Sequence, residues 1–532
     1  MQEKLEYKKV LPGDYGLPHG EWRPNQHEAV EFILDNKGTV ILEAPTGSGK
    51  TGISSALGSE ERVVSLVRTK FLQQDNYDSN YRFDVLYGRA NYKCPKLSSA
   101  FERVNADECE HKSNMTECPD FRNCDYFNHR ERAKGSMRAS LNYAFWLSSM
   151  GNQSWPSFDR LVMDEAHQLP DLTIEWAGIT LTRKDREEYS FPLFPPIFNT
   201  RASEGKKSSG DRVLAFLSGC LAGVTTRVDS LKGVSIMTKE LKKAEQMQAK
   251  IKATIEALQK GEEGWYIRSG LDAVNGEMGL VAKPLTARYH FDNYFSGDFR
   301  RLIMSATIGN YEVFAEELGI SKFDFHTIPN AFTASQRPIH ALDAPRMGNK
   351  STDKDYWKQA EVIAAAINQA PGEWSGIVHT TSIRQANELG QKLHSLVKGH
   401  PVYIQERKPT NQMMNDWHEY RNRHGNPILV SWAYWEGYDG TEEKICIAAK
   451  VPYPYIGDPY EMERMKYSGK FYLQRAAWQL EQGLGRVRRG RPQDYDMGGK
   501  VNGLVAIADG NWTRVKKYIS KSAVESVVTS GI

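Results

Sequence analysis

The chain has 532 residues, of which 40% are hydrophobic and 25% charged, a composition that excludes a disordered or fibrous protein and is typical of several globular domains. Its 69 basic and 66 acidic residues leave a net charge of +3, so bulk charge does not by itself indicate a nucleic-acid partner. The start, MQEKLEYKKV, lacks the apolar core of a secretion signal, and no apolar run reaches the about 18 residues that span a bilayer. We therefore expect a cytoplasmic protein, in a cell or in a virus-infected host.

Short β-branched runs recur along the chain with helical stretches between them. Such alternation is typical of α/β domains built on parallel sheets. Four runs come before residue 310 and four after residue 370, which predicts two α/β domains in series. The runs are TVILEA, RVVSLV, RLVMDE and RLIMSA, then GIVHTT, PILVSW, KICIAAKV and GLVAIA.

The first run leads into EAPTGSGKT, a glycine-rich sequence that precedes a helical stretch. Its glycines let successive backbone N–H groups face a phosphate, Lys50 adds a positive charge, and the Thr51 hydroxyl can bind magnesium. Position 44 holds alanine where the usual pattern has glycine. Between a strand and a helix, a phosphate loop is favoured over a chance turn. The expected phosphate-binding residues are Ala44, Pro45, Thr46, Gly47, Ser48, Gly49, Lys50 and Thr51.

Residues 88–140 interrupt the alternation and hold four of the six cysteines, Cys94, Cys109, Cys118 and Cys124. In a reducing cytoplasm such a cluster indicates a metal more than disulfides. The gaps of 14, 8 and 5 residues contain no closely spaced pair of the kind usual at structural zinc sites. Spacing alone favours an iron–sulfur cluster and leaves zinc open. The aromatic and basic residues nearby could stack on bases or form the core of this segment: Tyr92, Phe121, Arg122, Tyr126, Phe127 and Arg130.

The third run, RLVMDEAH, ends in acidic residues. A phosphate-loop enzyme needs a carboxylate at the end of a neighbouring strand to organise magnesium, and Asp164 has that position. Glu165 follows it, where a carboxylate can orient or deprotonate the attacking water. An Asp-Glu pair alone is more often a solvated turn, but the phosphate loop favours the catalytic interpretation.

Residues 171–290 also lack the strand–helix rhythm and indicate mostly helix and loop. Apolar residues keep a spacing of three and four from Met237 to Leu258, and Gly261 follows as a stop signal. This pattern predicts one long amphipathic helix whose apolar face packs against neighbouring helices.

The motifs APTGSGKT and DEAH, followed by MSAT at Met304–Thr307 and by QGLGRVRR at residues 482–489, resemble those of superfamily 2 helicases. GRANYKC, LNYAFWL, WEGYDG and AAKVPYPYIGDP are similar to the XPD/DinG group of iron–sulfur helicases, which carry a cysteine insertion between the first two motifs. The resemblance extends from RPNQHEAV to GLVAIADGNW. One departure is that Asp439 runs directly into Gly440, which shortens the loop after Trp435 and Glu436.

The resemblance implies an ATP-dependent DNA helicase that moves 5′ to 3′ on single-stranded DNA, uses ATP and magnesium, and carries a 4Fe–4S cluster. It implies two RecA-like domains, residues 1–87 with 141–170 and 291–332, and residues 333–532. It further implies an iron–sulfur lobe at 88–140 that acts as a strand-separating wedge, and a helical arch-like insertion at 171–290. The expected partners of this monomer are single-stranded and forked DNA, with RNA and DNA–RNA hybrids left open, in DNA repair or replication.

The residues that the resemblance assigns to the nucleotide come from both domains. Arg23 and Gln26 would lie on the adenine side, and Asp439 would belong to the same site. Arginines of the last motif would stabilise the transition state of phosphoryl transfer. The catalytic set would be Lys50, Asp164, Glu165, His167, Gln482, Arg486 and Arg489, and the cluster ligands Cys94, Cys109, Cys118 and Cys124. The alternatives are a nucleic-acid-stimulated ATPase that remodels protein–DNA complexes and a nuclease-helicase, although no further pair of carboxylates indicates a nuclease.

Overall fold

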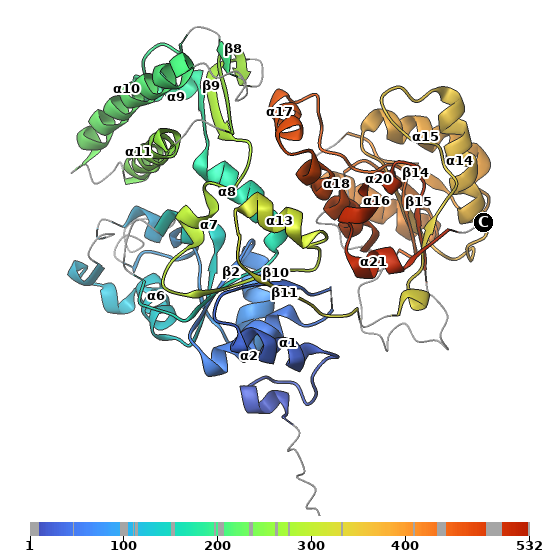
Figure 1. The fold of residues 1–532 in the computed structure, drawn as a ribbon, viewed down its shortest axis with the longest axis horizontal. Helices are drawn as coiled ribbons and strands as arrows, with labels where there is room; N and C mark the ends of the chain where they lie inside the picture. Colours follow the sequence, from blue (N-terminus) through green and yellow to red (C-terminus); the bar gives the residue numbers. More distant parts are fainter. Residues whose placement is uncertain are drawn as a thin grey trace, which may run out of the picture.

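A computed structural model describes residues 10–45, 47–95, 105–109, 111, 115–149, 155–195, 198–200, 207–232, 238–260, 264–274, 277–330, 333–407, 410–433, 443–485 and 503–529. Figure 1 shows three bodies: an α/β body in blue, a second α/β body in orange and red, and a green body above the first. Several residues predicted for the nucleotide or DNA sites lie outside the described residues: Thr46, Trp435, Glu436, Asp439, Arg486 and Arg489.

The first body is built on a sheet of seven parallel strands in the order β11-β1-β10-β5-β2-β4-β3. The four apolar runs before residue 310 form its central strands, as predicted: β1 Thr39–Glu43, β2 Val63–Val67, β5 Arg160–Met163 and β10 Arg300–Ser305. Three further strands were missed: β3 Asp84–Leu86, β4 Arg138–Asn142 and β11 Asp324–Thr327. Strand β4 crosses residue 140, so the expected end of the cysteine segment cuts through a strand of the first sheet.

Helices cover both faces of the first sheet, because its strands are buried on both sides and need apolar cover. They are α1 Gln26–Asp35, α2 Lys50–Glu60, α3 Lys70–Leu72, α4 Ser79–Tyr81, α6 Asp125–Gly135, α7 Tyr143–Ser149, α8 Leu169–Ala177, α12 Phe291–Phe295 and α13 Tyr311–Leu318. A π turn, η2 Gln73–Asp78, connects α3 to α4. Short 3-10 turns are η1 Pro12–Tyr15, η3 Arg89–Asn91, η4 Ala106–Glu108, η5 Met115–Glu117, η6 Phe121–Asn123 and η7 Ala166–Gln168.

The second body repeats this architecture with seven parallel strands in the order β14-β15-β13-β16-β17-β12-β18. The four later runs are strands as predicted, β13 Gly376–His379, β15 Ile428–Ser431, β16 Ile445–Ala448 and β17 Leu504–Ile507, and the others are β12 Ile339–Ala341, β14 Val402–Ile404 and β18 Val527–Val528. Its helices are α14 Asp353–Asn368, α15 Ile383–Leu396, α16 Thr410–His424, α17 Pro459–Tyr467, α18 Gly469–Leu484, α20 Trp512–Val515 and α21 Lys521–Glu525, with 3-10 turns η9 Ala334–Gln336 and η11 Lys516–Tyr518. Two parallel α/β sheets in series confirm the predicted fold class.

The insertion between α8 and α12 is mostly helix and loop, as the sequence predicts, but it also contains a sheet that the sequence did not indicate. Its helices are α9 Arg183–Tyr189, α10 Lys207–Leu231 and α11 Thr238–Gln259. They accompany an antiparallel sheet in the order β6-β9-β8-β7, formed by β6 Ile179–Thr182, β7 Phe198–Thr200, β8 Trp265–Val274 and β9 Glu277–Pro284. Helix α11 confirms the predicted long helix. The strands escaped notice because glycines and charged residues interrupt the apolar alternation on which a strand prediction depends.

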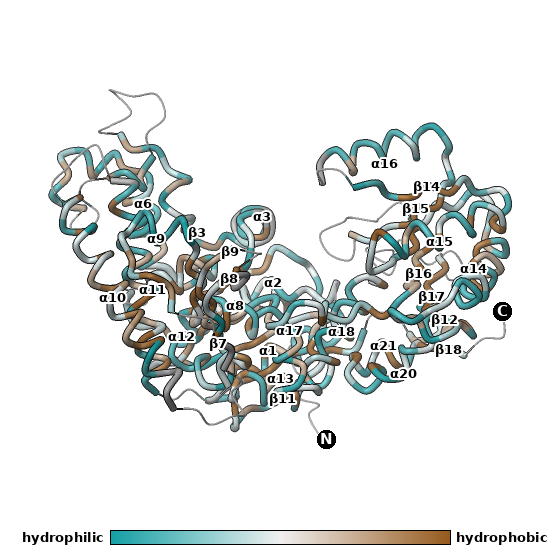
Figure 2. Tube along the Cα trace, turned by 90° about the horizontal axis from the view of Figure 1, so that it is seen from above, coloured by the Kyte–Doolittle hydropathy of each residue, from teal (hydrophilic) through white to brown (hydrophobic). Residues whose placement is uncertain are grey.

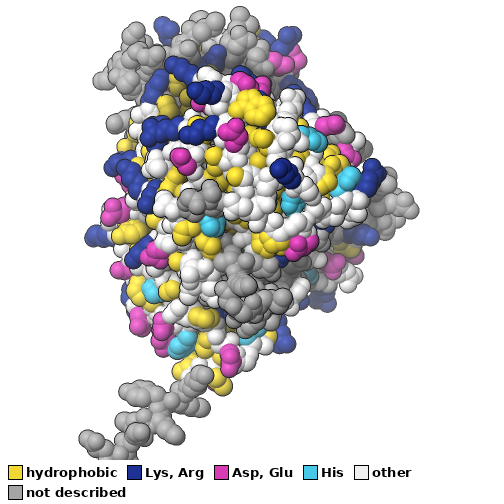
Figure 3. Space-filling model, turned by 90° about the vertical axis from the view of Figure 1, so that its right-hand side faces the viewer, with side chains coloured by type: hydrophobic (Ala, Val, Ile, Leu, Met, Phe, Trp, Pro, Cys, Tyr) yellow, Lys and Arg dark blue, Asp and Glu magenta, His cyan; other side chains and the backbone are white. Residues whose placement is uncertain are grey.

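Apolar packing links the bodies: one buried cluster includes Ile41 and Leu161 of the first sheet, Trp478 of α18, and Val505 of the second sheet. Figure 2 colours strands inside the second body, such as β15 and β16, as hydrophobic. The insertion has a buried core of its own around α10 and α11. Lys, Arg, Asp and Glu side chains are interspersed over the face drawn in Figure 3, in line with the small net charge. Among the described helices, none is both long enough and apolar enough to cross a membrane.

Candidate active site

The phosphate loop joins the buried end of β1 to the start of α2. Gly47 and Gly49 have φ of 88° and 86°, a left-handed backbone that other residues rarely adopt. A Cβ on Gly49 would lie 2.5 Å from Gln26 Nε2, so this position needs glycine for space as well. The Gln26 amide donates to the Gly49 carbonyl at 3.0 Å, and the Arg23 guanidinium donates to the Gly47 carbonyl. Both residues predicted for the adenine side therefore lie against the loop and hold its shape.

Lys50 begins helix α2 directly after the loop. Its ammonium group lies 3.4 Å from the Ala44 carbonyl oxygen, so it is held over the loop. The partly buried Thr51 follows in the first turn. The first N–H groups of a helix have no partner within the helix and attract anions. Together with the ammonium group, this helix start can bind phosphate groups.

Asp164 directly follows β5, and its N–H donates to the Leu66 carbonyl of β2 at 3.0 Å. Its side chain is 5% exposed. Oδ1 accepts from the Glu165 N–H at 2.9 Å, and Oδ2 accepts from the Tyr77 hydroxyl at 3.0 Å. Burial and then the charge of Glu165 raise the pKa of Asp164 to about 6, although Lys50 opposes the shift. A magnesium ion here would add positive charge beside the buried Asp164 and the partly exposed Glu165.

His167 links the first body to the second. It lies in the turn after Asp164, and the Gln482 amide of α18 donates to its Nε2 at 2.8 Å. On the other side of the ring, Ser305 Oγ lies 3.0 Å and Glu165 Oε2 3.5 Å from Nδ1. A single imidazole thus contacts the catalytic carboxylate candidate, the MSAT motif and the last motif of the chain. The structure thus brings together Gln482 and His167, two residues of the expected catalytic set.

The loop after β10 makes a second connection between the two bodies. Glu43, at the end of β1, accepts from the N–H groups of Ile308 at 3.1 Å and Gly309 at 2.7 Å. The Ile308 carbonyl accepts from the Gln474 amide at 2.5 Å and from the Trp478 indole at 2.9 Å. Because Gln474 and Trp478 belong to α18, this loop joins the strand before the phosphate loop to the helix that carries Gln482.

Both ends of this connection are tightly constrained. Burial and then the charge of Glu481 raise the pKa of Glu43 to about 8, although the N–H groups of Gly309 and Ile308 oppose the shift. Gly309 has φ of 69°, and a Cβ there would lie 2.1 Å from the Tyr518 carbonyl oxygen. Any larger residue at position 309 would force the two bodies apart.

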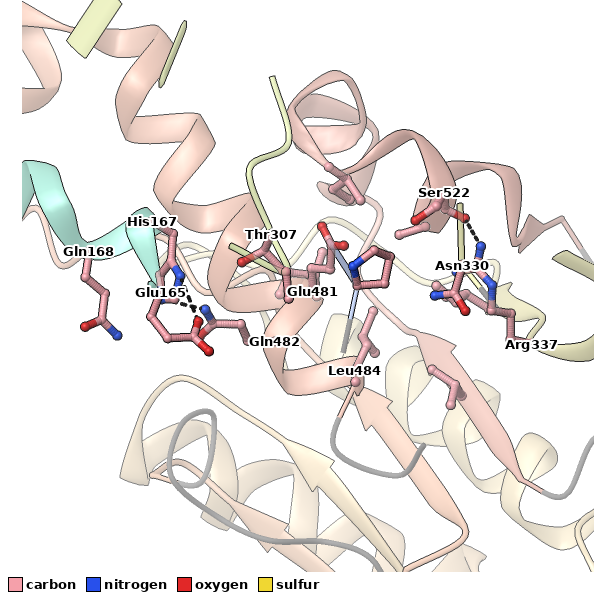
Figure 4. A pocket seen from close by; sticks show the side chains of 18 of the residues that line it. Glu165, His167, Gln168, Thr307, Asn330, Arg337, Glu481, Gln482, Leu484 and Ser522 are labelled. Atoms are coloured by element: carbon pink, nitrogen blue, oxygen red, sulfur yellow. Dashed lines mark hydrogen bonds and ion pairs between the residues drawn. The ribbon is translucent and has the colours of Figure 1, made fainter. Parts of the chain in front are cut away.

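These elements line one cleft between the two bodies. In Figure 4, Glu165, His167 and Gln482 point toward one another at one end of it. At the other end, the Arg337 guanidinium donates to the Ser522 carbonyl at 2.7 Å. The described lining also includes Pro45, Arg68, Thr69, Leu72 and Thr307 from the first body and Leu484, Gly485, Val505 and Ile519 from the second.

An ionic cluster outside the cleft also joins the two bodies. Arg464 of α17 is 4% exposed and donates through Nη1 to Asp171 of α8 at 2.6 Å, and its Nη2 lies 3.5 Å from Glu317 of α13. Arg475 of α18 lies 3.6 Å from the same Asp171. Removing one partner of such a buried pair is costly, because it leaves the other charge uncompensated. The two bodies are therefore held together by ion pairs as well as by apolar contacts.

The four clustered cysteines line one small pocket. None of them is in a disulfide. Cys109 and Cys124 directly follow the 3-10 turns η4 and η6, and Cys118 follows η5, so short turns aim the thiols inward. Burial raises the pKa of the Cys109 thiol, and the neighbouring Cys94 adds to the shift.

Aromatic residues form the support of this pocket. Tyr92 and Tyr126 are buried, with their rings edge to face at 5.4 Å, and the Arg89 guanidinium lies 4.5 Å above the Tyr126 ring. Of the aromatic residues singled out in the sequence, Tyr92 and Tyr126 therefore form the core of this segment and are not free to stack on bases. Phe121 and Phe127 pack against each other at 5.3 Å and are partly exposed. Only the latter pair, with the exposed Arg122, is available to a nucleic acid.

Within the described residues, no three His, Cys, Asp or Glu side chains lie close enough together to hold a single metal ion. A tetrahedral zinc ion binds sulfur at about 2.3 Å, so its ligands must crowd one point. The cysteine pocket does not have that arrangement. An iron–sulfur cluster distributes its thiolates over separate irons and accepts sulfurs that are further apart.

Several residues of the site gave no signal in the sequence. Tyr77, Gln474 and Trp478 are ordinary residues in their own segments and gain importance only through contacts across the fold. Glu43 stood next to the phosphate loop, but its contact with Gly309 spans 266 residues of sequence.

Residues 365–509 match the model of the helicase C-terminal domain family. ATP-dependent DNA helicase YoaA of Haemophilus influenzae is 21% identical over 216 residues, which is 29% of this chain and 34% of that protein. The match therefore spans about a third of that relative's length.

Two solved structures are similar over almost the whole chain. The structure of S. tokodaii Xpd4 has a TM-score of 0.55 at 13% identity, covering 96% of this chain and 100% of the other. A structure of an XPD helicase has a TM-score of 0.52 at 14% identity, covering 94% of this chain and 98% of the other. These likenesses show the fold, and with the family match they confirm the resemblance to XPD/DinG-like helicases of superfamily 2 that the motifs indicate.

Proposed function

We propose that this protein is an ATP-dependent DNA helicase that translocates 5′ to 3′ on single-stranded DNA. The observation that carries the proposal is the cleft between the two bodies, in which Glu165 and His167 of the first body meet Gln482 of α18. A helicase C-terminal domain match over residues 365–509 and a DNA helicase relative support it. Cytoplasmic location, action as a monomer, and forked DNA as the substrate belong to the same proposal.

The first body would bind the nucleotide. Lys50 and the N–H groups at the start of α2 would hold the phosphates, with Arg23 and Gln26 keeping the loop in shape. Thr51 and Asp164 would hold magnesium, whose charge would neutralise the phosphate oxygens during transfer. The position of Asp164 supports this role, because its buried carboxylate directly follows β5, next to Glu165. Glu165, partly exposed in the cleft, would orient the attacking water.

The second body would close the cleft over the nucleotide. Gln482 lies in the last turn of α18, shortly before Arg486 and Arg489 in the sequence, which we propose as the arginines that stabilise the transition state. The contact of Gln482 with His167, and that of Gln474 and Trp478 with Ile308, support a coupling of closure to the phosphate site. Only the nucleotide-bound state would bring both sides of the cleft together. Each cycle of ATP hydrolysis would therefore move one body relative to the other along the DNA strand.

The cysteine pocket is the proposed site of an iron–sulfur cluster. Four thiols without disulfides line it, and burial raises the pKa of the Cys109 thiol. We propose that Cys94, Cys109, Cys118 and Cys124 hold a 4Fe–4S cluster, which would fix the fold of this lobe. Residues 88–140 would then act as a wedge at the DNA fork, and residues 171–290 would form an arch beside it. The first RecA-like domain would consist of residues 1–87, 141–170 and 291–332, and the second of residues 333–532.

A strand-displacement assay tests the proposal. Protein purified without oxygen is incubated with ATP and magnesium on duplexes that carry either a 5′ or a 3′ single-stranded tail. We expect ATP hydrolysis stimulated by single-stranded DNA, and displacement only from the 5′-tailed duplex. Stimulated hydrolysis without displacement on either duplex would contradict a helicase and would favour an ATPase that remodels protein–DNA complexes.

A further inference from the structure

The segment from Lys70 to Tyr81 is a helical stretch interrupted by a π turn. It consists of α3, the π turn η2 Gln73–Asp78, and α4. A π turn accommodates one extra residue, which rotates the following side chains relative to a regular helix, and such turns are frequent at functional sites. The turn contains Tyr77, whose side chain is completely buried.

The Tyr77 hydroxyl contacts the carboxylate that the proposed function assigns to magnesium. It donates to Asp164 Oδ2 at 3.0 Å, while Oδ1 accepts from the Glu165 N–H at 2.9 Å. Each oxygen of the carboxylate thus has its own donor, and the plane of the carboxylate is fixed. Tyr77 is itself held in place, since its ring packs edge-on against Phe83 at 4.9 Å and its carbonyl accepts from the Phe83 N–H at 3.0 Å.

The same segment contacts the two neighbouring sites. At its end, the Tyr81 hydroxyl forms a hydrogen bond with His19 Nε2 at 3.0 Å and lies 3.3 Å from where a Cβ of Gly52 in α2 would be. At its start, the Lys70 ammonium group donates to Asn91 Oδ1 at 2.9 Å, three residues before Cys94. Tyr77 is therefore the central point of a segment that spans from the cysteine lobe to the phosphate-binding helix.

We infer that Tyr77 is a positioning residue for Asp164, holding its carboxylate in the orientation that receives magnesium. The inference rests on the proposed ATP hydrolysis. Without the Tyr77 hydroxyl, the carboxylate would keep the Glu165 N–H on Oδ1 but would lose the bond to Oδ2 that fixes its plane. Partners of this kind behind a metal ligand typically change metal affinity or activity by about 10–100-fold when lost.

The variant Tyr77→Phe removes the hydroxyl and keeps the ring. We expect the magnesium concentration for half-maximal ATP hydrolysis to rise about tenfold, with the KM for ATP unchanged at saturating magnesium. Tyr143→Phe is a matched control, because the buried Tyr143 hydroxyl donates to the backbone carbonyl of Asp164 at 2.7 Å and not to its carboxylate. It should keep the magnesium requirement of the wild type.

Thermal unfolding gives a readout that does not depend on turnover. A non-hydrolysable ATP analogue is added with magnesium or with EDTA, and the increase in Tm is compared. We expect Tyr77→Phe to lose most of the increment due to magnesium and to keep the increment due to metal-free nucleotide. If Tyr77→Phe equals the wild type in both assays, the inference is overturned.

The two assays also separate the inference from the proposed function. A wild type that hydrolyses no ATP but shows a magnesium increment that Tyr77→Phe loses would refute the function and support the inference. A wild type on which magnesium has no effect in either assay would overturn both.

Discussion

The phosphate site and the cysteine pocket are held in different ways. In the phosphate site the functional side chains stand at the ends of buried parallel strands, and the described partners of Asp164, His167 and Glu43 lie at hydrogen-bond distance. The cysteine pocket is built from 3-10 turns of three residues, with Tyr92, Tyr126 and a few small residues as its core. The comparison suggests that regular structure shapes the first site before any ligand binds, whereas the second site depends on its ligand for shape.

The largest expected effect comes from a variant that changes the phosphate site alone. Lys50→Ala removes the ammonium group next to Asp164 and should reduce ATP hydrolysis on the order of a hundredfold or more. Iron content and thermal stability should stay as in the wild type, because Lys50 has no contact with the cysteine pocket. Steady-state ATPase assays and iron analysis check this. Loss of iron in the same variant would show that the two sites are not independent.

A cysteine variant should have the reverse pattern. Cys118→Ser removes one thiol of the pocket, so we expect loss of bound iron and increased protease cleavage within residues 88–140. Nucleotide binding should remain within about tenfold, because the parallel sheet keeps its own core. Iron analysis, limited proteolysis and nucleotide titration check this, with Cys220→Ser as the control for loss of a buried thiol elsewhere. Stoichiometric zinc in the wild type would refute the iron–sulfur assignment.

A smaller effect concerns the link between the two bodies. Gln482→Ala and His167→Ala should each lower DNA-stimulated ATPase by about tenfold, and the double variant should lose little more, because both remove the same contact. A double-mutant cycle of kcat/KM checks this. Gln385→Ala, in α15 of the second body, is a control outside the cleft lining described for both bodies. Additive losses in the double variant would mean that the two residues act separately.

The smallest expected effect is a pH dependence of stability. Burial raises the pKa of Glu43 from 4.5 to about 8, so between these values the unfolded chain loses a proton that the folded chain keeps. The contribution of Glu43 to stability is complete below pH 4.5, falls as the pH rises to about 8, and is constant above it. Glu43→Gln should therefore flatten the decrease of the free energy of unfolding across this window, whereas the exposed Glu60→Gln should not. Denaturant titrations at several pH values check this, and parallel curves for Glu43→Gln and the wild type would contradict it.

The sequence predicted those features that leave a local pattern in it, such as an apolar run or a binding motif. Eight apolar runs became strands, and the phosphate loop and Asp164 came together because parallel strands end at one edge of a sheet. Short edge strands such as β3 were missed, since three residues carry too little periodicity. The longer strands β8 and β9 of the insertion were missed because glycines and charged residues interrupt their alternation. Contacts such as Tyr77 with Asp164, or Gly309 with Tyr518, join residues that are far apart in the sequence, so no local pattern predicts them.

The central claim is that ATP hydrolysis and strand separation reside in different parts of the chain. The most direct test measures both in one reaction, on a forked DNA with a 5′ tail, for the wild type and for Cys118→Ser. The account predicts that the wild type hydrolyses ATP and separates the strands, whereas Cys118→Ser retains DNA-stimulated hydrolysis and separates none. Equal loss of both activities in Cys118→Ser, or strand separation at the wild-type rate, would contradict it.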